Sequence, residues 1–336
     1  MIRYSPFASI VPALSLLGLV PIQAGAQETI APADIQPPQV HQLAVNIQED
    51  LETLRWHMGK PIEGRPFIPV EDVAIRENFR QAMTLWSKVN ELGVELVGGG
   101  EPAPIVPAPR GGEYGPAQVH QVLVDVLDRL AEIRSGTEIV GAAAINGESN
   151  APRLDPTATP DDVFKVIVQN NRQVNRMLER STQPGDVYQQ FQQATFYASE
   201  ILAAIDDPNP FPNMPPHQPG MTPGHVYGRV LGVFDRLSVA FEALGLEMVD
   251  WAGGAYQIDQ TITPGDVIDL GTLLLSELEY LHSRIPGARA PINAAHPGTR
   301  WPSDVYQLVG LLDDQATRIM VQARQNPGLF GEPGEN

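Results

Sequence analysis

The sequence predicts an all-α protein with about eight helices of roughly 18–22 residues each. Three observations predict this fold class. A phrase of proline, any residue, a polar residue and valine recurs along the chain, as in Pro264–Val267 and Pro302–Val305. A stripe of apolar residues with helical spacing follows each copy of the phrase. No stretch of the sequence sustains the alternation of apolar and polar residues that a half-buried strand needs.

The recurring phrase has the composition of a helix N-terminus. In "TPGDV", Thr263 is the N-cap, and Pro264 takes the first helical position, where a missing N–H costs no hydrogen bond. Asp266 can accept a hydrogen bond from the backbone N–H of the cap and favours the positive end of the helix dipole. The predicted capping residues are Thr159, Pro160, Asp162, Pro184, Asp186, Thr222, Pro223, Thr263, Pro264, Asp266, Pro302 and Asp304.

Four helices are predicted in the first half of the chain. Their apolar stripes run from Val40 to Leu54, from Ile75 to Val89, from Val119 to Ile133 and from Val163 to Met177. The second is the least regular, because Pro69 lies one residue too early for the phrase. Asn170 interrupts the fourth stripe, and a buried asparagine at such a position most often sets the register against a partner.

Four more helices are predicted in the second half, with stripes over residues 187–205, 226–244, 267–281 and 305–323. The intervals between the valines of the phrase vary from 24 to 46 residues, which excludes a solenoid of constant period. Only 24 residues separate Val163 from Val187, so we expect the fourth and fifth helices to form an antiparallel hairpin.

The other connections are long and rich in proline and glycine, as in "DDPNPFPNMPPHQPG" from Asp206. An extended linker of about 16 residues spans roughly 50 Å. A helix of about 20 residues spans roughly 30 Å. A linker of this kind can therefore act as a strap that returns along one helix and starts the next in parallel.

The fourth and eighth helices also resemble each other beyond the cap, because Gln173 matches Gln315 and Arg176 matches Arg318. This match indicates two four-helix halves, residues 27–182 and 183–325, packed as tandem bundles or as one continuous bundle. Residues 326–336 are expected to form a disordered tail.

The N-terminus has the features of a cleavable signal peptide over residues 1–26. Arg3 is the only charge before an apolar run from Phe7 to Val20, and Ala24-Gly25-Ala26 provides small residues at the cleavage positions. The run is short and interrupted by proline and glycine, which favours cleavage between Ala26 and Gln27 over a membrane anchor. We therefore expect a periplasmic or secreted protein without an integral membrane segment after cleavage.

The composition excludes several kinds of chemistry. The chain has no cysteine, which rules out disulfides, thiolate catalysis and haem attachment through cysteine. The net charge of −18 becomes −19 when the signal peptide removes Arg3, and this acidity opposes binding to nucleic acid. The sequence contains no phosphate loop, dinucleotide fingerprint or nucleophile elbow, and we predict no cofactor.

Two sets of residues are candidates for ligand binding. Aromatic residues follow the valine of the phrase at Phe164, Tyr188, Tyr227 and Tyr306. They either fill a fixed packing position or, together with Asn170, line a ligand cleft.

The second set would bind a metal ion and comprises His41, His120 and His225. These histidines lack a His-x-x-x-His or duplicated Glu-x-x-His pattern, and the single copy, Glu279 with His282, is weak evidence for a metal site.

These patterns predict a non-enzymatic exported protein, with no catalytic residues, that binds another protein of the envelope or scaffolds an envelope assembly. The alternative is a periplasmic four-helix sensor that binds a ligand or metal through the aromatic and histidine positions. A third reading is an enzyme whose site is built from dispersed carboxylates. Asp125 with Asp128 and Asp313 with Asp314 instead fit solvated helix faces.

Overall fold

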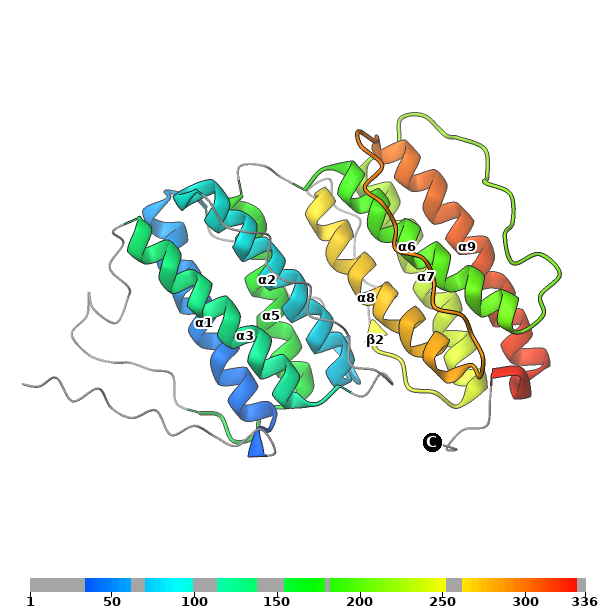
Figure 1. The fold of residues 1–336 in the computed structure, drawn as a ribbon, viewed down its shortest axis with the longest axis horizontal. Helices are drawn as coiled ribbons and strands as arrows, with labels where there is room; N and C mark the ends of the chain where they lie inside the picture. The colour runs from blue at the N-terminus through cyan, green and yellow to red at the C-terminus, as the bar shows by residue number, and fades with distance from the viewer. Residues whose placement is uncertain are drawn as a thin grey trace, which may run out of the picture. The chain divides into compact units, whose positions relative to one another are not determined.

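The computed structural model describes residues 34–61, 70–98, 114–137, 154–178, 182–251 and 262–330. Within these ranges the chain is all-α with eight α-helices, which confirms the predicted fold class (Figure 1). The predicted signal peptide and the last six residues of the predicted tail lie outside the described residues.

The helices are α1 (Pro37–His57), α2 (Ile75–Val97), α3 (Pro116–Gly136), α5 (Pro160–Met177), α6 (Pro184–Ala204), α7 (Pro223–Leu244), α8 (Pro264–Arg284) and α9 (Pro302–Gln325). Two short strands, β1 (Val70–Glu71) and β2 (Asp250–Trp251), pair antiparallel, with Val70 opposite Trp251. In the described ranges, seven of the eight helices begin with the predicted proline.

Helix α2 is the exception to the capping phrase. It begins at Ile75 after the N-cap Ala74, so Val73 precedes the helix instead of lying in its first turn. The backbone N–H of Val73 donates a hydrogen bond to Oδ1 of Asp161 on α5 at 2.9 Å. The early position of Pro69 is consistent with this difference, because the phrase is incomplete there.

The capping contacts have the geometry that the phrase requires. The side chains of Thr159, Thr222 and Thr263 accept hydrogen bonds from the backbone N–H three residues later. In the opposite direction, the backbone N–H of Thr263 donates to Oδ2 of Asp266 at 2.8 Å. Gln183 and Trp301 replace threonine at the N-cap of α6 and α9, and their N–H groups donate to Asp186 and Asp304 at 2.8 Å.

The helices pack around two hydrophobic cores. We call α1, α2, α3 and α5 the first bundle; there, α1 and α2 each pack on both α3 and α5. We call α6–α9 the second bundle; there, α6 and α7 each pack on both α8 and α9. The two bundles therefore share one packing order, in which the first two helices of each bundle are not the main neighbours of each other. The boundary between halves at residues 182 and 183 stays a prediction.

The predicted hairpin of the fourth and fifth helices is wrong. Helix α5 packs on α1 and α2, whereas α6 packs on α8 and α9. The physical reason is that α5 is apolar on two faces: Val163 and Ile167 enter the first core, and Phe164 and Val168 enter the second. A short connection between α5 and α6 thus joins two bundles instead of closing one hairpin.

The helices of the second bundle are parallel. The proline and valine of the capping phrase on all four helices line one hollow, so α6, α7, α8 and α9 begin at the same end of the bundle. Two of the connections that return the chain to that end are described over their whole length, and they run along the helices (Figure 1). We call residues 205–222 the first strap and residues 285–301 the second strap.

The exposure of the side chains in the second strap repeats every third residue, which is the period of a polyproline II helix. Pro291, Ala294, Pro297 and Arg300 are half-buried, and the intervening residues are exposed. In the first strap, Pro212 and Pro215 are half-buried with the same spacing. One edge of each strap therefore faces the bundle while the other edges face solvent.

The predicted disordered tail is wrong for its first part. Residues Pro327–Phe330 form a 3-10 turn, η3, after α9. Phe330 is buried in the second core, and η3 packs on α7 and α9. Burying the phenylalanine ring supplies an apolar contact that the proline- and glycine-rich composition of this segment does not indicate.

Candidate functional site

The hollow of the second bundle lies at the N-terminal end of its four helices. Its volume is about 210 Å³ only when space that is open to solvent is counted, so the enclosed volume is smaller. Pockets for small molecules usually occupy about 300–1,000 Å³ and contain a few polar groups that orient the ligand. This hollow fits a single apolar side chain better than a metabolite, because it is shallow and apolar. Its lining consists of Pro184, Val187, Pro223, Val226, Pro264, Val267, Pro302 and Val305.

Charged residues and histidines surround the same end of the bundle. Nε2 of His296, in the second strap, lies 3.1 Å from Oδ1 of Asp186 on α6. Nε2 of His217, in the first strap, lies 3.4 Å from Oδ1 of Asp304 on α9. Each strap is thus held at the N-terminal turn of a helix other than the one it leads into.

Further hydrogen bonds hold the straps along the helices. Nε2 of Gln307 on α9 donates to the carbonyl oxygen of Pro215 at 2.7 Å. Nε2 of Gln189 on α6 donates to the carbonyl oxygen of Ala294 at 2.8 Å. These contacts satisfy backbone groups of segments that form no regular sheet or helix, and they fix which strap residues face solvent.

Large apolar side chains occupy the outer edges of the straps. Phe211 and Met214 in the first strap are 66% and 45% exposed, and Ile292 and Trp301 in the second are 72% and 70% exposed. Phe211 lies at a bend of the first strap, and Met214 lies three residues later in the irregular stretch that follows. The straps thus present apolar groups in a fixed arrangement.

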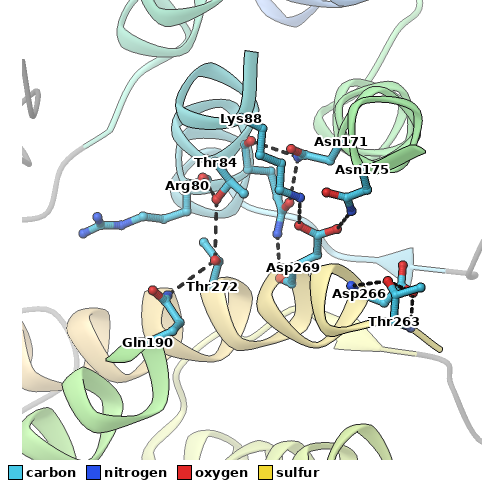
Figure 2. Close-up of polar contacts among 11 residues, drawn as sticks. Arg80, Thr84, Lys88, Asn171, Asn175, Gln190, Thr263, Asp266, Asp269 and Thr272 are labelled. Atoms are coloured by element: carbon cyan, nitrogen blue, oxygen red, sulfur yellow. Dashed lines mark hydrogen bonds and ion pairs between the residues drawn. The ribbon is translucent and has the colours of Figure 1, made fainter. Parts of the chain in front are cut away.

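A second candidate site is a polar contact between α2 and α8, which we call the seam (Figure 2). Nζ of Lys88 lies 2.5 Å from Oδ1 of Asp269, and Nδ2 of Asn175 on α5 lies 3.3 Å from Oδ2. Gln81 donates to the backbone oxygen of Asp269 at 3.0 Å. Burial raises the pKa of Asp269 above its usual value, and the charge of Lys88 opposes that effect.

The seam also shows the relative direction of α2 and α8. Along α2, Arg76, Thr84 and Lys88 meet Glu277, Thr272 and Asp269 respectively. Residue numbers rise along one helix as they fall along the other, so the two helices are antiparallel. These residues connect the first bundle to the second with paired charges and hydrogen bonds.

The seam was not predicted from the sequence. The stretch "LGTLLLSELEYL" in α8 contained a signal, because three consecutive leucines indicate a helix that is apolar on more than one face. Helix α8 is buried over most of its length, including Asp269, Thr272, Ser276 and Glu277. Polar residues within such a helix indicate a buried polar contact with another element.

The four aromatic positions lie in the second core or at its edge. Phe164 and Tyr227 are buried in the second core. Tyr188 and Tyr306 are half-buried and pack at its edge, with the guanidinium carbons of Arg300 and Arg229 lying 5.0 and 4.4 Å from their ring centroids. None of the four lines the hollow.

Asn170 lies in the interior of the first bundle. Its Nδ2 donates to the carbonyl oxygen of Ala44 on α1 at 2.8 Å, and the residue is fully buried. The neighbouring Asn171 donates to the carbonyl oxygen of Gln81 on α2 at 3.1 Å. The two amides thus join α5 to different helices, which is the arrangement expected of residues that set the packing register.

The histidine positions lie on three different helices. His41 is half-buried on α1, and burial lowers the pKa of the half-buried His120 on α3. His225 on α7 accepts a hydrogen bond from the backbone N–H of Thr222 and acts as a cap. Across the described ranges, no group of three or more histidine or acidic side chains is placed to hold a metal ion.

The Glu-x-x-His pair of α8 is engaged in other contacts. Glu279 forms an ion pair with Arg80, and Nε2 of His282 lies 2.8 Å from the carbonyl oxygen of Arg289. Both residues therefore have protein partners within the described part of the chain.

No family model, curated protein or solved structure matches this chain. None of the described helices is both long enough and apolar enough to cross a membrane.

Proposed function

We propose that this chain is an exported protein of the cell envelope that binds a partner protein and does not catalyse a reaction. The observation that carries the proposal is the exposure of Phe211 and Met214 on a strap that is hydrogen-bonded to α9 through the carbonyl oxygen of Pro215. Exposed apolar side chains cost little conformational entropy on binding when the backbone that carries them is already ordered. The N-terminal features of a signal peptide support the location.

The partner that fits this strap is a protein with a groove lined by aromatic residues. Such grooves bind extended proline-rich segments. A polyproline II helix is ordered before binding, and every third side chain lies on the same edge and can enter the groove. The first strap contains the sequence "PNPFPNMPP", in which Phe211 and Met214 are the large apolar side chains. The acidic balance of the chain, −18 overall, favours a partner whose groove has a basic rim.

The test uses the double variant Phe211→Ser with Met214→Ser. The bait is the mature chain, cross-linked in envelope extracts of its native host and quantified by mass spectrometry. We expect one stoichiometric partner with the wild type and at least a tenfold loss with the double variant. The unfolding midpoint should not change, since both side chains are exposed.

The matched control is Trp56→Ser, which removes a side chain that is 71% exposed on α1 of the first bundle. This variant should retain the partner. Equal capture by the double variant and the wild type would contradict binding through the strap. Amino-terminal sequencing tests the location separately, and it should read from Gln27.

A further inference from the structure

A pair of buried acidic residues lies at the end of the seam. Glu77 on α2 and Glu277 on α8 are each 0% exposed. Nε of Arg76 lies 2.5 Å from Oε1 of Glu77, and a terminal nitrogen of the same guanidinium lies 3.0 Å from Oε2 of Glu277. One cation therefore serves two carboxyl groups that come from different bundles.

In the described part of the chain, the neighbouring arginine is engaged in a different ion pair. Arg80, one turn further along α2, forms its ion pair with Glu279 of α8. The guanidinium carbon of Arg76 lies 4.1 Å from the ring centroid of Tyr280, and Arg76 also donates to the carbonyl oxygen of Glu247 at 2.9 Å. Within the described ranges, Arg76 is the only cation that forms an ion pair with Glu77 or Glu277.

Two ionised carboxylates beside one guanidinium would leave a net negative charge away from water. An unbalanced buried charge costs more than a neutral group, and neighbouring carboxylates disfavour ionisation of each other. Burial is the largest effect that raises the pKa of Glu77 well above its usual value, and Glu277 raises it further, against the opposing charge of Arg76.

The hydrogen-bonding groups lead to the same conclusion. Oε2 of Glu77 and Oε1 of Glu277 are buried without a hydrogen-bond partner. Buried polar atoms in proteins almost always have a partner. A carboxyl proton placed between Glu77 and Glu277 provides a donor where two ionised carboxylates provide only acceptors.

We infer that Glu77 and Glu277 share one proton at neutral pH and form a proton-binding site that joins α2 to α8. When the O–H bond breaks at alkaline pH, the proton passes to solvent and two negative charges remain beside Arg76. The contact between the bundles then weakens. The stability of the seam therefore depends on whether this proton is bound.

The direction of the pH dependence follows from linkage. A carboxyl group whose pKa is higher in the folded state binds more protons when folded, so stability falls as pH rises. The decrease begins at the unfolded value, about 4.3 for glutamate, and ends at the folded value. Within that window the unfolding equilibrium constant rises about tenfold per pH unit for one shared proton.

Infrared difference spectroscopy tests for the proton directly. The full chain at neutral pH should show the carbonyl stretch of a protonated carboxylic acid. Glu77→Gln and Glu277→Gln should each remove that band, because an amide donates to the remaining carboxylate without a titratable proton. Glu132→Gln is the control and should retain the band, since the side chain of Glu132 is 65% exposed.

Urea unfolding measured between about pH 5 and pH 9 provides the second readout. As pH rises through the linkage window, the unfolding constant of the wild type divided by that of Glu77→Gln should rise by about tenfold per pH unit. If Glu77→Gln does not fold, the measurement with Glu277→Gln has the same expectation.

Three results would each overturn the inference. The first is absence of the acid band from the wild type at neutral pH, and the second is its persistence in both variants. The third is a loss of stability on adding a chelator that magnesium restores in the wild type but not in Glu77→Gln. That last result would mean that a cation occupies the position assigned to the proton.

Discussion

The Cβ that Gly185 lacks would lie 2.5 Å from the backbone oxygen of Gly298. Gly185 is the second residue of α6, and Gly298 belongs to the second strap, so the backbone of the strap touches the backbone of the helix. This contact explains the glycine after proline in this copy of the capping phrase. At Gly265 a side chain, not a backbone, occupies the space that a Cβ would need, because Nδ2 of Asn175 would lie 2.9 Å from an added Cβ.

Gly185→Ala should destabilise the protein by about 1–3 kcal/mol, the usual range when a methyl group is forced into a closely packed position. The strap backbone cannot move aside as a flexible side chain can. Urea unfolding followed by circular dichroism measures the change.

Gly232→Ala is the matched control for that substitution. An added Cβ at Gly232 in α7 would meet only the end of the Arg236 side chain, at 3.3 Å. Alanine within a helix is more stable than glycine by about 0.5–1 kcal/mol, so this variant should gain stability. Equal losses in the two variants would show that the strap contact has no special effect.

Lys88→Met should cost about 3–5 kcal/mol, because it leaves Asp269 as a buried charge without its ion-pair partner. Adding Asp269→Asn to Lys88→Met should recover most of that loss, since the asparagine oxygen can still accept from Asn175. Urea unfolding of both variants tests this coupling. A double variant as unstable as Lys88→Met would mean that packing, not charge, determines the cost.

The cap of α5 predicts a loss of stability as pH falls, whereas the shared proton of Glu77 predicts a loss of stability as pH rises. The backbone N–H and then the hydroxyl of Thr159 lower the pKa of Asp162. This stability is present above the unfolded value of about 3.9 and is lost as pH falls through the lower folded value. Thr159→Ala should raise the pKa of Asp162 in an NMR titration and destabilise the protein by about 0.5–2 kcal/mol. An unchanged pKa of Asp162 would contradict the capping role.

Substitutions at the aromatic positions separate packing from ligand binding. Tyr227→Ala should cost about 3–5 kcal/mol, because its ring is buried in the second core. Tyr188→Ala should cost less, since its ring is only half-buried at the edge. Thermal unfolding compares the two variants. If both unfold at the wild-type temperature, packing does not explain why the aromatic position recurs.

The helix starts were predictable because capping is local. Thr263, Pro264 and Asp266 lie within one helical turn, so their spacing in the sequence is enough to predict the geometry of the cap. The stripes were predictable for a similar reason: Val305, Leu308 and Leu312 are buried on one face of α9, as the helical period requires.

The partner of each helix was not predictable from the same patterns. The apolar residues of α5 divide between two cores. Nothing in the sequence indicates that Phe164 packs in the second core while Val163 packs in the first. The pairing of Glu77 with Glu277 was equally inaccessible, because 200 residues separate them and either carboxylate alone resembles an ordinary surface charge.

The parallel arrangement of the second bundle has a consequence for the speed of folding. Neighbouring helices there meet through residues far apart in sequence, as in the contact of Arg229 with Tyr306, 77 residues apart, and of Gln315 with Ser199, 116 residues apart. Helical proteins usually fold fast because most of their contacts are local. Here the loops between neighbouring helices must close before those helices can pack, so we expect refolding to be slower than that of an up-and-down bundle of equal length.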